Sequence, residues 1–325
     1  MLRLATIGSG SIVELFLDAV KKTEGISLMA VYSRTQERAE EFGKKHGAAK
    51  WFSDVDAMLT DREIDCVYVA SPNSLHYSYA KKALSAGKHV ICEKPFVGNR
   101  NEAEELFAIA EEKNLYLMEA ITVLHMPNFK CVREWLSQIG AVHLANFNYS
   151  QYSSRYDAYM EGRITNVFDP EFAGGALMDI NVYNLHAAAG LFGAPKKAHY
   201  FANRGFNGID CSGTAVLSYG GFVCTCMGAK DCDGDNRAVI EGEKGYIVVK
   251  EGGNLWGSAE LFLRNGERRT VEYDLSTNRM VFETADFVRA VEGEDREGFL
   301  SWKKESLLVM EILDQLRGYS LPSQQ

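Results

Sequence analysis

A repeated strand–helix pattern over residues 1–120 constrains the fold of this chain more than any other feature of its sequence. Short apolar segments that read as buried strands alternate there with helical patterns. The predicted strands are residues 2–7, 27–32, 66–70, 89–92 and 115–119, and the predicted helices are residues 11–22, 36–46, 74–86 and 101–114. Repeated units of this kind build a parallel sheet with helices on both faces.

The pattern changes after residue 120. Successive short strands follow one another from residue 198 to residue 273, separated by hairpin signals such as Gly220-Gly221. A longer strand is predicted at residues 142–151, and helices near residues 128–137, 176–190, 280–291 and 303–317. We therefore expect an α/β protein with a parallel sheet in residues 1–120, followed by an α+β domain with a large, mostly antiparallel open sheet in residues 121–325.

The composition excludes several classes of protein. A hydrophobic fraction of 46% with 24% charged residues is typical of a folded globular chain and not of a disordered one. The 35 basic and 44 acidic residues give a net charge of -9, which argues against an extended nucleic-acid-binding surface. We find no apolar run of about 18 residues that would span a membrane. The 7 cysteines are an odd number in apolar surroundings, and the start has no signal-peptide pattern, so we expect reduced thiols and a cytoplasmic location.

A glycine-rich turn joins the first predicted strand to the first helix. Gly8 would permit the tight turn, and Gly10 would let the backbone approach a pyrophosphate at the helix N-terminus. The third glycine of the usual fingerprint is replaced by Val13. The turn therefore predicts a dinucleotide site, with a plain strand–helix turn as the alternative.

The end of the second predicted strand bears on the choice between NAD and NADP. An acidic side chain at this place binds the ribose hydroxyl of NAD and repels the extra phosphate of NADP. This chain instead has Ser33-Arg34 followed by Arg38 one helical turn later, which suits a phosphate. We expect NADP to be preferred, with NAD possible. The alternatives are a solvated helix start, or Arg34 stacked on the adenine of either cofactor.

Three further motifs carry a resemblance to a known family. They are Ser71-Pro72-Asn73-Ser74-Leu75-His76, Glu93-Lys94-Pro95, and the segment from Gly174-Gly175 to Tyr183. In this order and spacing they resemble the Gfo/Idh/MocA oxidoreductases (glucose–fructose oxidoreductase, inositol dehydrogenase, rhizopine catabolism) over nearly the whole chain. Tyr183 stands where many members have His, so the chain is most similar to the dihydrodiol and sugar dehydrogenases. Asn181 replaces a glycine that the family pattern leads us to expect.

The resemblance implies an NAD(P)-dependent oxidoreductase with two domains. Residues 1–120 would be the NAD(P)-binding Rossmann domain, and residues 121–325 would bind substrate and build a homodimer or larger homo-oligomer through the open sheet. The family's cofactor contacts map onto Gly8, Ser9, Gly10, Ser11, Ile12, Ser33, Arg34, Ser71, Asn73, His76, Glu93 and Lys94.

Hydride transfer to or from an alcohol carbon also needs a proton moved on or off the oxygen. We expect Tyr183 to be the acid/base, with Lys94 holding the substrate oxygen and favouring the phenolate. Asp179, Tyr183 and His186 are spaced to share one helix face, and Asp179 would orient a substrate hydroxyl. The alternatives are a surface Lys94, a core Tyr183 and a helix-capping Asp179.

His186 and Tyr156 are weaker candidates for substrate contact. A hydrogen-bonded structural histidine and a loop tyrosine in local packing are their alternatives.

The predicted activity is the interconversion of a secondary alcohol and a ketone on a sugar, cyclitol or trans-dihydrodiol. No metal is expected to be required. A non-catalytic dinucleotide-binding sensor of the same fold is the second hypothesis. The presence of Lys94, Asp179 and Tyr183 together argues against it, because a sensor does not need all three.

Overall fold

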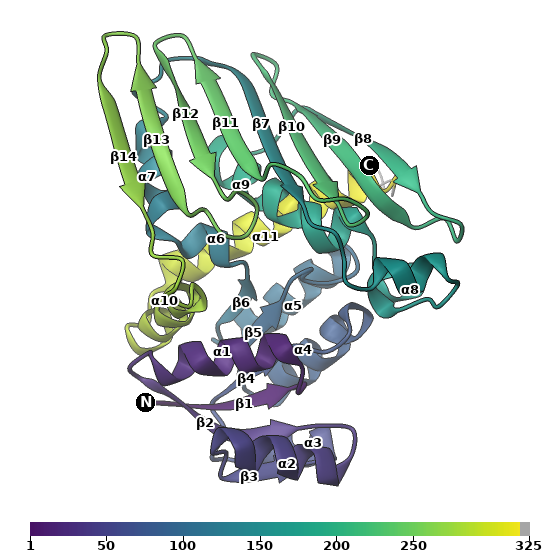
Figure 1. Cartoon of the computed structure of the whole chain (residues 1–325). Coiled ribbons are helices and arrows are strands. Elements are labelled where there is room, and N and C mark those ends of the chain that lie inside the picture. The colour runs from purple at the N-terminus through teal and green to yellow at the C-terminus, as the bar shows by residue number, and fades with distance from the viewer. Residues whose placement is uncertain (319–325) are drawn as a thin grey trace, which may run out of the picture. The chain divides into compact units, whose positions relative to one another are not determined.

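A six-stranded parallel sheet organises the first unit, which consists of Met1–Ala120 and Asn278–Leu307 (Figure 1). The computed structural model describes residues 1–318 and gives the strand order β3-β2-β1-β4-β5-β6. The strands are β1 (Leu2–Ile7), β2 (Ile26–Tyr32), β3 (Lys50–Phe52), β4 (Cys66–Val69), β5 (His89–Glu93) and β6 (Leu117–Ala120). The order reverses between β1 and β4, and in such sheets ligands bind outside the carboxyl ends of the strands at this switch point.

Helices accompany the strands of this unit, and all of them except the short η1 (Asn73–Leu75) have buried apolar positions. They are α1 (Ser11–Lys21), α2 (Gln36–His46), α3 (Val55–Thr60), η1 (Asn73–Leu75), α4 (His76–Ser85), α5 (Arg100–Glu112), α10 (Met280–Glu292) and the first part of α11 (Arg296–Leu316). Side chains mark their starts: Thr35 caps α2 by accepting from the backbone of Arg38, and Asn99 caps α5 in the same way. The parallel pairing of these six strands, with helices between them, confirms the predicted parallel sheet.

The two-part division differs from the predicted one in one segment. The cut after Ala120 lies where the sequence analysis placed it, but Asn278–Leu307 join the first unit and not the second. Asn278 donates a hydrogen bond to the carbonyl of Leu15 in α1, and Ser306 donates one to the buried carboxylate of Glu119. These contacts link residues that are 263 and 187 positions apart in the sequence, so local patterns do not reveal them. Residues 319–325 of the predicted second domain lie outside the described residues.

An eight-stranded sheet organises the second unit, Ile121–Thr277 with the chain from Leu308 (Figure 1). Its order is β14-β13-β12-β11-β7-β10-β9-β8; β7 and β10 are parallel, and the other neighbours are antiparallel. The strands are β7 (Val142–Ser150), β8 (Lys197–Arg204), β9 (Asp210–Ser218), β10 (Val223–Ala229), β11 (Arg237–Gly242), β12 (Gly245–Lys250), β13 (Ser258–Leu263) and β14 (Arg268–Glu272). The predicted mostly antiparallel sheet is confirmed.

Helices cover one face of this sheet. They include α6 (Thr122–His125), α7 (Pro127–Trp135), α8 (Tyr156–Met160), η2 (Asn166–Phe168), η3 (Pro170–Phe172), the π-helical turn η4 (Leu177–Asn181) and α9 (Val182–Phe192). α7 packs on β13 and β14, and α9 packs on β7 and β10. As a result, burial alternates along the strands. On β7, Ala145 and Phe147 are buried, whereas Leu144, the residue before Ala145, is 55% exposed.

No helix within residues 1–318 combines the length and the apolar character that a membrane span requires.

Candidate active site

The turn after β1 has the backbone shape that a dinucleotide site needs. Gly8 has a φ of 122°, and an added Cβ would lie 2.4 Å from the carbonyl oxygen of Ala70, so a side chain is excluded there. A Cβ on Gly10 would meet no atom within 4 Å. Gly10 therefore borders open space at the start of α1, whose N-terminus has no side-chain cap.

Val13 explains the missing third glycine. Its side chain is fully buried, and a methyl group of it lies 3.5 Å from the position of an added Cβ on Gly8. The valine at the third position therefore fills the contact between the helix and the sheet. It leaves the open side of the turn at Gly10 unaffected.

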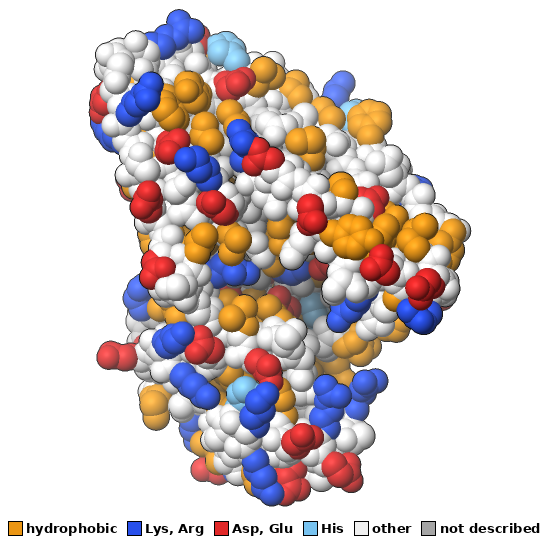
Figure 2. Space-filling view, in the orientation of Figure 1, with side chains coloured by type: hydrophobic (Ala, Val, Ile, Leu, Met, Phe, Trp, Pro, Cys, Tyr) orange, Lys and Arg blue, Asp and Glu red, His pale blue; other side chains and the backbone are white. Residues whose placement is uncertain are grey.

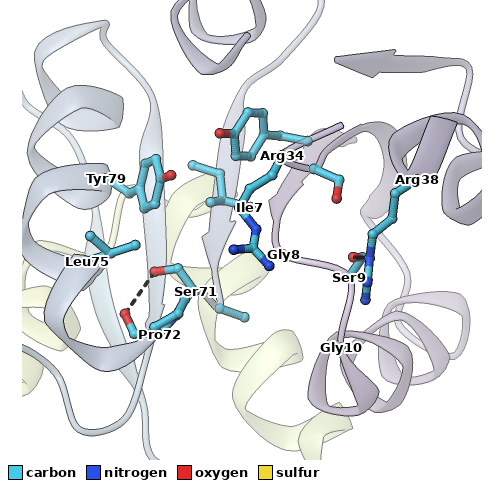
Figure 3. Close-up of a pocket in the computed structure, with 13 residues that line it drawn as sticks. Ile7, Gly8, Ser9, Gly10, Arg34, Arg38, Ser71, Pro72, Leu75 and Tyr79 are labelled. Carbon is cyan, nitrogen blue, oxygen red and sulfur yellow. Dashed lines mark hydrogen bonds between the residues drawn. The ribbon is translucent and has the colours of Figure 1, made fainter. Parts of the chain in front are cut away.

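A cavity of about 210 Å³ opens beside this turn at the carboxyl ends of β1, β2 and β4 (Figure 3). It lies at the switch point between β1 and β4. Its lining residues are Ile7, Gly8, Ser9, Gly10, Tyr32, Ser33, Arg34, Arg38, Ala70, Ser71, Pro72, Leu75 and Tyr79.

The charged groups of this cavity are two arginines. Arg34 extends from the end of β2 across the cavity, and the Arg38 Nε atom donates a hydrogen bond to Ser9 Oγ at 2.9 Å (Figure 3). The lining contains no Asp or Glu. A dianionic phosphate at this corner would meet two guanidinium groups and no repelling carboxylate.

Burial raises the pKa of the Tyr79 phenol, opposite these arginines, to about 12. The cavity wall at Tyr79 is therefore a neutral phenol at physiological pH.

His76 and Glu93 are buried near the candidate nucleotide site. The two ring nitrogens of His76 each lie 2.9 Å from a carbonyl oxygen, that of Ser71 and that of Pro95. Glu93 accepts a hydrogen bond from the hydroxyl of Tyr68, and burial raises the pKa of its carboxyl group. His76 therefore connects the loops that follow β4 and β5, and Glu93 at the end of β5 is hydrogen-bonded to Tyr68 in β4. Their predicted contact with a cofactor stays a prediction.

Ser11, Ile12, Asn73 and Lys94 have more accessible positions. Ser11 and Ile12 open α1 and are exposed, and Asn73 opens η1 with partial exposure. Lys94 directly follows β5 and is half-buried. Each of them is at the carboxyl edge of the parallel sheet.

The second unit holds the other predicted catalytic residues on one continuous helical segment. Asp179 lies in η4, and Tyr183 lies one turn later in α9; both side chains are partly exposed. The Tyr183 ring packs edge-on against Tyr149, with 5.8 Å between ring centroids. His186 is fully buried in α9, the environment of a structural histidine. Lys94 belongs to the first unit, so the predicted catalytic set is shared between the two units.

Gly174 and Gly175 let other backbone and side-chain atoms come close to the start of η4. A Cβ on Gly174 would lie 2.7 Å from the carbonyl oxygen of Asn166, and one on Gly175 would lie 2.1 Å from Asp210 Oδ1. Asp210 accepts hydrogen bonds from the backbone N–H of Leu177 at 2.6 Å and from the Tyr200 hydroxyl at 2.8 Å. The glycine pair therefore admits the carboxylate that caps this helix.

Asn181, in place of the expected glycine, has a structural role. Its side chain is fully buried, and its Nδ2 donates to the carbonyl of Cys226 in β10 at 2.8 Å. Its Oδ1 accepts a hydrogen bond from Asn184 at 2.9 Å. The substitution therefore fixes the end of η4 to the sheet.

Tyr156 lies in the packing of its own segment. Its ring is 5.7 Å from that of Phe168 and 6.1 Å from that of Tyr159, at the edge of a small buried cluster. Local packing, the alternative for this residue, accounts for its position.

Sequence reasoning missed Lys230, which the structure places against Asp179. Lys230 is buried at the end of β10 and forms an ion pair with the Asp179 carboxylate. The available signal was a single lysine at the end of an otherwise apolar strand, directly before the acidic turn 231–235.

No group of three or more His, Cys, Asp or Glu side chains within residues 1–318 is arranged to hold a metal ion. In the acidic turn, Asp231 accepts from the Ser212 hydroxyl, Asp233 accepts from the backbone of Tyr152, and Asp235 pairs with Arg237. These carboxylates are engaged with different partners.

Comparisons with known proteins agree with this architecture. Residues 2–121 match the model of an oxidoreductase family with an NAD-binding Rossmann fold, and residues 129–248 match the GFO/IDH/MocA C-terminal domain. The chain is 39% identical to the scyllo-inositol 2-dehydrogenase (NADP+) of Bacillus subtilis, over 98% of this chain and 96% of that protein. It is 28% identical to the mouse trans-1,2-dihydrobenzene-1,2-diol dehydrogenase, over 97% and 96% of the two chains.

Among solved structures, a 3-ketoreductase from Actinomadura kijaniata in complex with NADP and TDP-benzene superposes with a TM-score of 0.85. It is 25% identical, and the match covers 98% of this chain and 97% of that one.

Proposed function

This chain belongs to the Gfo/Idh/MocA family of oxidoreductases, and from that premise we propose that it is an NADP-preferring dehydrogenase of a polyhydroxylated small molecule. The family and its relatives make it an NAD(P)-dependent oxidoreductase that acts on CH–OH groups. The proposed substrate is a sugar, a cyclitol or a trans-dihydrodiol, and the relatives named above include dehydrogenases of scyllo-inositol and of a trans-dihydrodiol. The proposed reaction interconverts a secondary alcohol and a ketone.

One observation carries the cofactor preference. The cavity at the β1–β4 switch point combines the open Gly8–Gly10 turn with Arg34 and Arg38, and no carboxylate lines it. The turn and the N-terminus of α1 suit a pyrophosphate, because the helix dipole and its first N–H groups favour anions. The arginines suit the additional phosphate that distinguishes NADP from NAD.

When bound, NADP(H) accepts or supplies the hydride at the substrate carbon. In the reducing direction, the carbonyl carbon gains the hydride with its electron pair, and the carbonyl oxygen takes a proton from the Tyr183 hydroxyl. In the oxidising direction, the Tyr183 phenolate removes the proton from the substrate hydroxyl. The Lys94 ammonium stabilises negative charge on the substrate oxygen and on the phenolate in both directions.

Asp179 has a different task in this proposal. A carboxylate accepts hydrogen bonds and cannot donate them when ionised. Asp179 would therefore hold a hydroxyl group of the substrate next to the reacting carbon and fix its orientation. A polyhydroxylated substrate offers such a hydroxyl, whereas a simple ketone does not.

Fluorescence titration of the protein with NADPH and NADH, followed by a turnover assay on a panel of cyclitols, sugars and trans-dihydrodiols, tests the proposal. We expect tighter binding of NADPH and turnover on at least one panel member. Tight cofactor binding without turnover on the whole panel would favour the non-catalytic sensor instead.

We further propose a homodimer or larger homo-oligomer built on the open face of the eight-stranded sheet. Hydrophobic side chains are interspersed with charged ones over these strands (Figure 2). Leu144, Val223 and Tyr246 are 55%, 39% and 43% exposed, and each precedes a buried residue that faces the helices. An exposed apolar surface of this kind is typical of an interface. Sedimentation at micromolar concentration tests this, and a monomer of 36.2 kDa would contradict it.

A reducing compartment such as the cytoplasm suits the cysteines. All 7 are free thiols, and Cys224 and Cys226 lie on β10 with 4.0 Å between their sulfur atoms. We therefore propose a cytoplasmic location.

A further inference from the structure

Lys230 is an unusual residue in the second unit because its charged side chain is almost completely removed from solvent. The side chain is only 2% exposed. Lys230 directly follows β10, whose cysteines and alanine are also buried. A buried ammonium group is unfavourable unless its charge and its N–H groups are satisfied. Its contacts therefore indicate what the lysine is for.

The Lys230 ammonium contacts a carboxylate, a carbonyl oxygen and an aromatic ring. It forms an ion pair with Asp179 Oδ2, donates a hydrogen bond to the carbonyl oxygen of Val167 at 3.1 Å, and lies 4.9 Å from the centroid of the Phe168 ring. The aromatic face adds a cation–π interaction. The carboxylate is the partner that matches the charge of the lysine.

The ion pair is asymmetric in its exposure. The Asp179 side chain is 25% exposed, whereas the Lys230 side chain is 2% exposed. The lysine therefore lies behind the aspartate, and the carboxylate keeps an accessible side.

The backbone around Asp179 is also unusual. Asp179 is the middle residue of η4, and π-helical turns of this kind are frequent at functional sites. Asp210 holds the start of the turn through Leu177, and Asn181 holds its end on β10. Lys230 then fixes the one side chain of this turn that carries a charge.

We propose that Lys230 is a positioning residue of the active site, which keeps the Asp179 carboxylate ionised and oriented so that its accessible side accepts a hydrogen bond from a substrate hydroxyl. The inference rests on the proposed function, in which Asp179 binds substrate. Lys230 itself touches neither substrate nor cofactor in this account.

The test compares the parent protein with Lys230→Met and Lys230→Gln. Methionine has a similar length without a charge, and glutamine also keeps N–H groups that can serve the Val167 carbonyl. If Lys230→Met does not fold, Lys230→Gln carries the test, because it removes the charge and keeps a polar contact. Cofactor affinity is measured in each variant to show that the first unit is intact.

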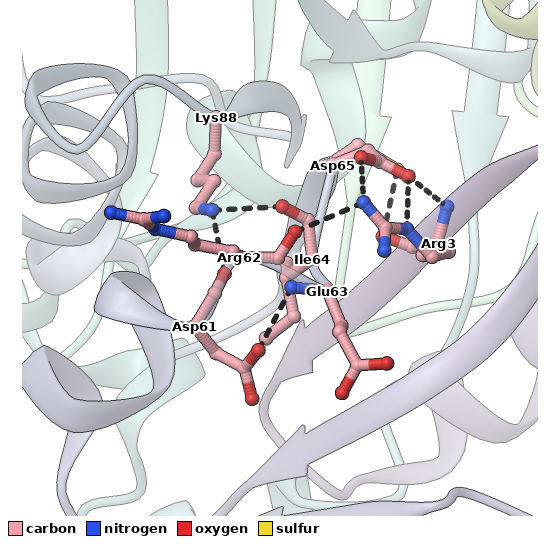
Figure 4. Close-up of polar contacts among 8 residues, drawn as sticks. Arg3, Asp61, Arg62, Glu63, Ile64, Asp65 and Lys88 are labelled. Carbon is pink, nitrogen blue, oxygen red and sulfur yellow. Dashed lines mark hydrogen bonds and ion pairs between the residues drawn. The ribbon is translucent and has the colours of Figure 1, made fainter.

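Lys88 offers a matched control in the first unit. It is also buried, at 8% exposed, and its ammonium donates to the carbonyl oxygens of Asp61 and Ile64 at 2.8 Å each (Figure 4). Lys88→Met therefore removes a buried ammonium and its hydrogen bonds without touching Asp179. Both methionine variants should lose thermal stability.

We expect kcat/KM to fall by about 10- to 100-fold in both Lys230 variants, the scale of a lost hydrogen bond to a charged group. The acid limb of the pH–rate profile should move to higher pH, because Asp179 is protonated more easily without the neighbouring ammonium. Asp179→Asn should abolish the effect of Lys230, so that the double variant equals Asp179→Asn alone.

Other titratable groups lie on the elements packed against η4. They are His143 and Tyr149 on β7, Asp210 and Cys211 on β9, Cys224 and Cys226 on β10, and Tyr183 and His186 on α9. They are the same in parent and variants, so the difference between the profiles isolates Lys230.

Two outcomes overturn the inference. If the parent turns over substrate while the Lys230 variants keep its kcat/KM and its acid limb, or change only as Lys88→Met does, Lys230 has a structural role alone. If the parent has no turnover on the whole panel, the proposed function fails and the inference fails with it.

Discussion

Two arginines stand at the end of β2, where an acidic side chain would select NAD. Arg34 lines the cavity, and Arg38 is fixed there by its hydrogen bond to Ser9. Their charges would act together on the additional phosphate of NADP. The loss of either arginine should therefore weaken the binding of NADP(H) more than the binding of NAD(H).

Arg34→Ala should reduce the affinity for NADPH by about 10-fold or more, the scale of a charge-assisted hydrogen bond, and reduce the affinity for NADH far less. Calorimetric titration of both cofactors measures the difference. Arg62→Ala removes an exposed arginine elsewhere in the first unit and serves as the control. Equal affinities of the parent for the two cofactors would contradict the assignment of this corner to a phosphate.

Tyr183→Phe should lower kcat by ~10²–10⁴-fold, the usual scale of general acid–base catalysis. Cofactor affinity should change little, because the proposed cofactor cavity is made of residues of the first unit. Tyr219→Phe is the control: it removes a buried hydroxyl from the second unit, and its hydroxyl has no hydrogen-bond partner. Near-normal turnover of Tyr183→Phe would show that another group transfers the proton. His186→Asn would then be the variant to compare.

At the scale of elements, the strongly periodic helices and strands were predictable, and the short or strained ones were not. The predicted bounds of β1 and α2 agree with the structure. β3 has three half-buried residues at a sheet edge, and α3 has six residues, too few for a clear period. The π-helical form of η4 also has no local signal, because the contacts that hold it come from residues 33 to 51 positions away.

The site could be predicted in part for the same reason. Motif residues such as Gly8 and Arg34 act through local backbone and side-chain chemistry, so their sequence neighbours reveal them. Asp210 and Lys230 act on Asp179 and its turn across the sheet, and their own neighbours carry little information about that task. Tertiary packing decides such roles.

Gly175→Ala should destabilise the second unit more than Gly162→Ala does. Both glycines have positive φ, 99° and 86°, so both variants carry the cost of that conformation, about 1–2 kcal/mol. A Cβ at residue 175 would also collide with Asp210 Oδ1, whereas one at residue 162 meets no atom within 4 Å. Thermal unfolding and turnover of the two variants measure the difference; equal losses would show that the Asp210 cap is not tight.

Asp65 makes the stability of the first unit sensitive to acid. Hydrogen bonds from the Arg3 side chain, which links β1 to the start of β4, hold the pKa of the Asp65 carboxyl below its ordinary value of 3.8 (Figure 4). A lowered pKa contributes stability above the ordinary value, and this stability is lost as the pH falls through the folded-state pKa.

Asp65→Asn should therefore lower stability at neutral pH and flatten its decline below about pH 4. Urea unfolding at a series of pH values measures this. Asp56→Asn, which removes a 68% exposed partner of Lys82, should leave the decline unchanged. If the stability of Asp65→Asn falls with decreasing pH as steeply as that of the parent, the Arg3–Asp65 pair is not the cause of the decline.

At the scale of the whole molecule, the chain divides its chemistry between two units. In the proposed function, Lys94 and the cavity at the β1–β4 switch point come from the first unit, and Asp179 and Tyr183 come from the second. Neither unit alone holds the full predicted catalytic set. The central claim is therefore that the intact protein transfers a hydride between a substrate CH–OH group and NADP.

Transfer of deuterium tests that claim most directly. A panel of cyclitols, sugars and trans-dihydrodiols deuterated at their carbinol carbons is incubated with the parent protein and NADP, and the cofactor is then analysed by mass spectrometry. The account predicts NADPH that carries one deuterium from at least one panel member, and much less of it with Tyr183→Phe in the same time. Bound NADP that gains no deuterium from any member of the panel would contradict it.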